Sequence, residues 1–101
     1  MLILPEQLQE VEELAGINYG PREIAKYLDI PENGFLKAWA EPGSVINKAY
    51  HKGQLMAQAQ IDLKLQESAK TGNLTATQQW QKIKDARDFE NVKTKLLEGL
   101  L

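Results

Sequence analysis

The sequence predicts an all-α protein, and three observations lead to that prediction. Apolar residues recur at intervals of three and four, which is the spacing of one face of a helix. The alternation of apolar and polar residues that marks a half-buried strand is absent, and the β-branched residues are scattered. Proline and glycine fall at short breaks that divide the 101 residues into helix-length segments.

Three short helices are expected at the start of the chain. The first begins at Pro5, whose fixed φ suits the first helical position, and the NYG run at 18–20 ends it. The second begins at Pro21, and the third follows the corner at 29–31 and ends near Trp39. Apolar side chains at helical spacing are expected to fill the core between them. These are Leu8, Val11, Leu14, Ile24, Ala25, Leu28, Ile30, Phe35, Ala38 and Trp39.

The stretch IAKYLDIPENGFLKAW, residues 24–39, has the residue types of a helix-turn-helix. Ala25 is the small residue where the two helices cross, and Ile30 closes the turn. The turn usually takes glycine, but Asp29 stands there, and aspartate tolerates left-handed backbone better than most residues. We therefore expect residues 1–42 to form a DNA-binding-like domain of this kind.

Residues 43–101 are expected to form a second, helical segment for oligomerisation or partner binding. Ser44 is the expected N-cap of a long helix over 45–70, which contains no proline and a single glycine. Gly72 suits the left-handed position that follows this helix. Thr75 and Gln78 have the spacing of a capping box, so a further helix is expected to begin there.

The tail from Phe89 is also compatible with a helix, and the second segment is therefore expected to end in a helical hairpin arm. Two alternatives stay open at Asp88, where the last helix either bends or continues.

Charge is divided unevenly along the chain. Residues 1–42 carry three cations against eight acids, a net of −5, whereas residues 43–101 carry nine cations against six acids, a net of +3.

On the third helix, Asn33 suits an adenine edge and Lys37 suits guanine or phosphate. Cations on the second and long helices suit the DNA backbone. The candidate DNA-binding residues are Arg22, Lys26, Asn33, Lys37, Lys48 and Lys52.

The acids beside these candidates support a different interpretation. Glu32, Glu41 and the carboxylates of the first helix would repel phosphate. A helical module that only packs, or that docks another protein, is therefore the alternative to DNA contact.

The long helix carries two apolar stripes, although a helix on a small domain usually hides one. One alternative is that both stripes are covered within the chain. The alternative that we favour is that one faces a second protomer, which predicts a homo-oligomer. The residues expected at that interface are Ile46, Tyr50, Met56, Ile61 and Leu65.

Residues 48–80, KAYHKGQLMAQAQIDLKLQESAKTGNLTATQQW, resemble the segment that follows the helix-turn-helix in small terminase subunits of tailed bacteriophages. The preceding YGPREIAKYLDIPENGFLKAW is similar to the opening helix-turn-helix of that family, so the resemblance covers about residues 5–85. The matching parts are Lys48-Ala49-Tyr50 with Gly53, Ala69-Lys70 with Gly72-Asn73, and Ala76 with Trp80.

The resemblance implies an oligomeric, often ring-forming protein of viral genome packaging. It implies binding to double-stranded DNA and delivery of phage DNA to the large motor-nuclease subunit or another phage protein. The chain departs from the family in having few cations on its third helix and little sequence beyond the fifth. The leucines at 96, 97, 100 and 101 would then bind the motor or join the oligomer.

The residues indicate no enzyme. His51 is the only histidine, and no GxxxxGK[ST] loop is present to hold a nucleotide. The chain has no cysteine, so thiolate metal sites are excluded, and we expect no cofactor and no metal. No apolar run approaches the roughly 18 residues of a membrane span, so we expect a cytoplasmic protein, in the host cell if a phage encodes it.

Two other functions are carried as alternatives to packaging. One is a helical protein–protein adaptor that does not bind DNA. The other is a small helix-turn-helix transcriptional regulator, for which the long helix would be the dimer interface.

Overall fold

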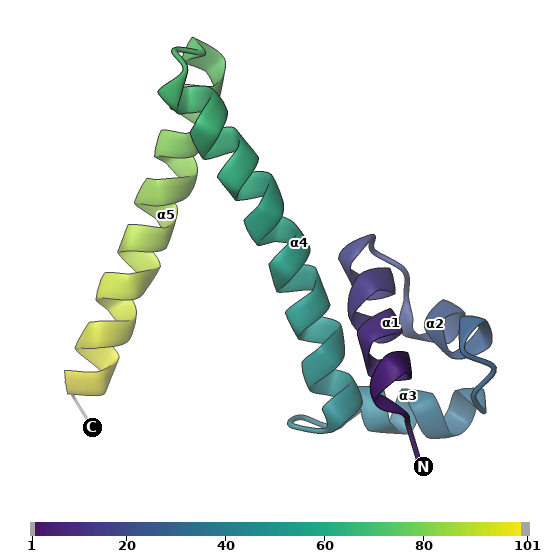
Figure 1. Cartoon of the computed structure of the whole chain (residues 1–101). Coiled ribbons are helices and arrows are strands. Elements are labelled where there is room, and N and C mark those ends of the chain that lie inside the picture. The colour runs from purple at the N-terminus through teal and green to yellow at the C-terminus, as the bar shows by residue number, and fades with distance from the viewer. Residues whose placement is uncertain (1, 100–101) are drawn as a thin grey trace. The chain divides into compact units, whose positions relative to one another are not determined.

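A computed structural model describes residues 2–99, and every regular element in that range is a helix (Figure 1). The helices are α1 (Pro5–Gly16), α2 (Pro21–Tyr27), α3 (Glu32–Ala40), α4 (Val45–Lys70) and α5 (Leu74–Gly99). The all-α class is therefore confirmed for this range. At Asp88 the helix continues, because α5 is a single element as far as Gly99. The chain divides into two compact units, Met1–Gln60 and Ile61–Leu101.

The core of the first unit is built by four helices. Its most deeply buried large side chains are Val11 from α1, Ile24 from α2, Phe35 from α3 and Ile46 from α4, all at most 1% exposed. The first half of α4 thus belongs to this unit, and the expected boundary after residue 42 lies inside it. The sequence pattern predicted the α1, α2 and α3 side chains of this core but placed Ile46 elsewhere.

The corner between α2 and α3 is a tight left-handed turn. Asp29 has a φ of 55°, which confirms the left-handed backbone expected there. The Asp29 amide donates to the Lys26 carbonyl at 3.2 Å, and the Ile30 amide donates to the Ala25 carbonyl at 3.0 Å. These two hydrogen bonds are the pair that ends a helix in a Schellman motif, so the corner satisfies the last carbonyls of α2.

Replacing Asp29 with glycine is expected to stabilise the protein by about 0.5–1 kcal/mol, because glycine adopts positive φ without the penalty that a Cβ brings. Asp29→Ala should lower stability by a similar amount, since alanine lacks the side chain that helps aspartate in this conformation. Chemical denaturation followed by circular dichroism measures both. Equal stability of the two variants would contradict the left-handed turn.

The junction of α3 and α4 is held by side-chain hydrogen bonds. Ser44 Oγ accepts from the Asn47 amide at 3.1 Å, which confirms Ser44 as the N-cap of α4, and it donates to the Ala38 carbonyl. Asn47 Nδ2 donates to the Trp39 carbonyl at 2.9 Å. The start of α4 is therefore tied to the end of α3, which explains why α4 shares the core of the first unit.

Helix α1 crosses α4 at a glycine. A Cβ built on Gly53 would overlap the Glu12 carbonyl oxygen and lie 2.7 Å from the Glu12 Cα. On the other side of the crossing, a Cβ on Gly16 would lie 3.2 Å from the Gly53 carbonyl oxygen and 3.3 Å from the Ala57 Cβ. Small residues on both helices thus allow their backbones to touch.

The second unit contains the end of α4 and all of α5. Between these two helices the chain reverses direction at residues 71–73 (Figure 1). Gly72 has a φ of 93°, as expected. The predicted capping box at Thr75 and Gln78 is wrong, because α5 begins at Leu74 and its cap is Asn73. The Asn73 Oδ1 accepts from the Ala76 amide at 2.9 Å.

A charged pair joins the two helices of the second unit. Arg87 Nη2 lies 2.7 Å from Asp62 Oδ2, and the Asp62 side chain is only 10% exposed. Nearer the turn, Thr77 Oγ1 donates to the Ala69 carbonyl at 3.4 Å. Within residues 2–99, no helix has the length and apolar character that crossing a membrane requires.

Candidate nucleic-acid interface

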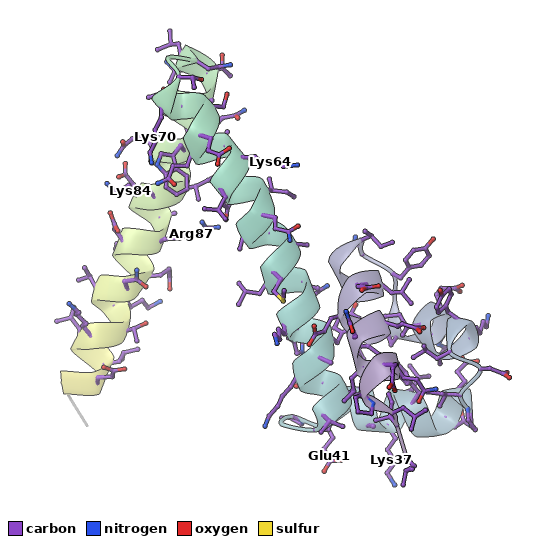
Figure 2. The ribbon with its side chains drawn as sticks, viewed as in Figure 1. Lys37, Glu41, Lys64, Lys70, Lys84 and Arg87 are labelled. Carbon is purple, nitrogen blue, oxygen red and sulfur yellow. The ribbon has the colours of Figure 1, made fainter. Side chains whose placement is uncertain are left out.

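The exposed face of α3 carries two of the candidate DNA-binding residues. Asn33 and Lys37 are both exposed and lie four residues apart, so they project from the same side of the helix. Among residues 2–99, no carboxylate lies within 4.0 Å of the Lys37 ammonium. Glu41 follows one turn after Lys37, at the C-cap of the same helix (Figure 2). The face thus offers one amide and one cation to a base edge or phosphate, with an acid close by.

The two cations on α2 are engaged with carboxylates. Arg22 Nε lies 3.6 Å from Glu32 Oε1 on α3, and Lys26 Nζ lies 3.9 Å from Glu23 Oε1. Both cationic side chains are about two-thirds exposed or more, at 72% and 66%. Exposed pairs of this kind contribute on the order of 0–1 kcal/mol, so a phosphate could replace the carboxylate at little cost.

The candidates on α4 lie one turn apart. Lys52 Nζ lies 3.6 Å from Glu12 Oε1 of α1, whereas Lys48 is exposed and has no carboxylate within 4.0 Å among residues 2–99. All six candidates therefore belong to the first unit and fall on three of its helices. That unit carries five cations against eight acids, a net of −3 over residues 1–60.

An apolar groove beside Lys26 was not expected from the sequence. Its volume is about 440 Å³, and it is lined by Leu14, Ile17, Tyr19, Glu23, Lys26 and Tyr27. Ile17, Tyr19 and Tyr27 are 68%, 47% and 67% exposed. The sequence pattern predicts only the end of the first helix at residues 17–20. The signal that this prediction missed is that Ile17, Tyr19 and Tyr27 are large side chains outside the apolar stripes expected to be buried.

The proposed oligomerisation residues divide into two groups. Ile46 and Tyr50 are 1% and 8% exposed, so they belong to the core of the first unit, which corrects their assignment to an interface between copies. Tyr50 packs edge-on against Trp39, with ring centroids 5.7 Å apart. Met56 and Ile61 are 46% and 60% exposed, and they stay a prediction together with the half-buried Leu65.

His51 is the one histidine of the sequence. His51 is exposed and stacks edge-on against Tyr50, with centroids 5.7 Å apart. Across the part of the chain that the structure describes, no three His, Asp or Glu side chains come together in a way that could hold a metal ion.

Comparisons of the chain with protein-family models, with curated proteins and with solved structures found no match.

Proposed function

We propose that this chain is a DNA-binding protein of viral genome packaging that resembles a small terminase subunit, with α2 and α3 acting as a helix-turn-helix. The observation that carries the proposal is the pair Asn33 and Lys37 on one exposed face of α3, immediately after the tight turn at Asp29. A helix presented in this way after a short turn suits the major groove of DNA.

In this proposal α3 enters the groove and the neighbouring helices hold the backbone. The Asn33 amide can both accept from adenine N6 and donate to N7, and the Lys37 ammonium can donate to guanine or phosphate. Arg22 and Lys26 of α2 supply further phosphate contacts, and so do Lys48 and Lys52 of α4. Double-stranded DNA, further copies of the chain and a large motor-nuclease subunit are the proposed partners, and ATP hydrolysis and DNA cleavage belong to that subunit.

A fluorescence-anisotropy titration against labelled duplex DNA, repeated over a series of salt concentrations, tests the proposal. The logarithm of the association constant should fall linearly with the logarithm of salt concentration, by about 0.9 per phosphate engaged. Lys37→Ala should reduce that slope by about 1. The matched control is Lys64→Ala, an exposed lysine of the second unit (Figure 2), and it should leave the slope unchanged.

The lysines at the start of α4 are tested in the same assay. The double variant Lys48→Glu, Lys52→Glu should reduce the slope by about 2 and abolish binding at physiological salt, because it replaces two cations with two anions. Unchanged binding would remove these two lysines from the interface.

The charge of the first unit favours a second candidate function, a helical adaptor that binds protein and not DNA. Three of its five cations already lie within 4.0 Å of a carboxylate, and its net charge is −3. Absence of DNA binding at low salt by the folded protein would favour the adaptor. Specific DNA binding by a simple dimer would favour a transcriptional regulator over a packaging protein.

A further inference from the structure

The last three turns of α5 carry an apolar stripe that no described residue of its own unit covers. Phe89, Val92 and Leu96 are 69%, 57% and 67% exposed, and Leu97 beside them is 57% exposed. Their spacing of three and four residues places the first three on one side of the helix. Leu100 and Leu101 lie outside the described residues. Three large side chains in line on one helix face form a surface that water solvates poorly.

This stripe faces away from the side of α5 that packs in its own unit. Arg87, which contacts Asp62 of α4, comes seven residues after the half-buried Trp80, or nearly two turns, so both project from the same side. Phe89 comes nine residues after Trp80, and nine residues are two and a half turns. The stripe is therefore on the opposite side of α5, where the packing against α4 cannot reach it.

We infer that this stripe pairs with the same stripe of a second copy of the chain, with the two α5 helices antiparallel and Phe89 of each beside Val92 of the other. The flanking charges support this arrangement. Asp88 and Lys95 are seven residues apart and lie on the same flank of the stripe. In an antiparallel pair, the same flank of each helix faces that flank of its partner, so Asp88 of one copy lies opposite Lys95 of the other. The two-fold symmetry of the pair produces this contact twice.

The charges along the line of the stripe favour the antiparallel pair over the parallel one. Lys82 and Asp85 continue that line toward the start of α5, seven and four residues before Phe89. In a parallel pair each of these residues would lie opposite the same residue of the partner. The two Lys82 side chains would then face each other, and so would the two Asp85 side chains. The antiparallel pair separates these like charges and also opposes the two helix dipoles.

This contact adds a surface on α5 to the oligomer of the proposed function, beside the residues of α4 that stay predicted, so it rests on the self-association part of that proposal and is independent of DNA binding. Sedimentation equilibrium of the full chain without DNA tests it. The wild type should form a dimer or a larger even-numbered assembly. Phe89→Lys should raise the dissociation constant at least about a hundredfold, as expected for an aromatic side chain at the centre of a small interface.

The matched control is Leu63→Lys, which introduces the same charge at a side chain of α4 that is 59% exposed. It should leave the dissociation constant unchanged. A wild type that is monomeric at every concentration would overturn both the contact and the proposed oligomer. If Leu63→Lys dissociates the oligomer and Phe89→Lys does not, the α5 contact is overturned, whereas the proposed oligomer stands. Neither outcome alters the DNA titration.

A charge exchange tests the antiparallel direction. Asp88→Lys should raise the dissociation constant about tenfold, because two attractive pairs become repulsive. Adding Lys95→Asp should restore the wild-type value, since the exchanged charges again face each other. Restoration by Lys93→Asp in place of Lys95→Asp would indicate parallel helices and overturn the inference. Circular dichroism of each variant verifies that α5 keeps its helical content.

Discussion

Gly53→Ala is expected to lower the melting temperature of the first unit by about 8–16 °C, which corresponds to a loss of roughly 2 kcal/mol in a domain of this size. Two effects oppose each other. Alanine in place of glycine within a helix normally stabilises by about 1 kcal/mol. At Gly53 the new methyl group would overlap the backbone of Glu12, and backbone atoms cannot rotate aside as a side chain does. The displacement of α1 costs about 3 kcal/mol, and this larger effect decides the sign.

The control for this prediction is Gly99→Ala, since a Cβ at that helical glycine meets no atom within 4 Å among the described residues. Because Gly99 is the last residue of α5, it carries only part of the gain in helix propensity and none of the overlap, so the melting temperature should be unchanged or slightly higher. Thermal unfolding followed by circular dichroism measures both variants. A Gly53→Ala protein as stable as the wild type would mean that α1 and α4 do not approach so closely.

Arg87→Ala is expected to destabilise the second unit by about 1–2 kcal/mol. The guanidinium lies 2.7 Å from the Asp62 carboxylate, whose side chain is 10% exposed, so its removal weakens a charge-assisted hydrogen bond at a largely dehydrated acid. Because Arg87 itself is half exposed, the loss is smaller than for a fully buried pair. Faster amide hydrogen exchange in the second half of α4 and the first half of α5 is the expected signature.

Lys84→Ala is the matched control for Arg87. Lys84 is an exposed cation three residues earlier on α5, and no carboxylate within residues 2–99 lies within 4.0 Å of it (Figure 2). Its replacement should change amide exchange little. A double-mutant cycle with Asp62→Asn isolates the pair, and a coupling free energy near zero would show that Arg87 does not hold the two helices together.

The local structure of this protein could be predicted from short stretches of sequence. Pro5, Pro21 and Ser44 mark helix starts, and the left-handed turns at Asp29 and Gly72 follow from residue types that adopt positive φ. The error at the start of α5 has a local cause as well. Asn73 and Thr75 both suit an N-cap, and the earlier residue also follows directly on the turn at Gly72.

The candidate site could be predicted only in part. Asn33 and Lys37 could be placed on one face because a helix repeats every 3.6 residues. The carboxylates that pair with Arg22 and Lys52 could not be predicted, because Glu32 and Glu12 come from other helices and approach only when the chain folds.

By itself, the sequence determined the helical class, the starts of the first four helices and the apolar stripes, because these depend on spacing and on backbone preferences within a few residues. Only the tertiary structure decided which partner each apolar face meets. Both Tyr50 and Phe89 lie on apolar stripes, yet Tyr50 is 8% exposed and Phe89 is 69% exposed. The physical reason is that burial depends on helices distant in sequence. Close approach at Gly53 brings α1 over the first half of α4, whereas no described helix of the second unit covers the last turns of α5.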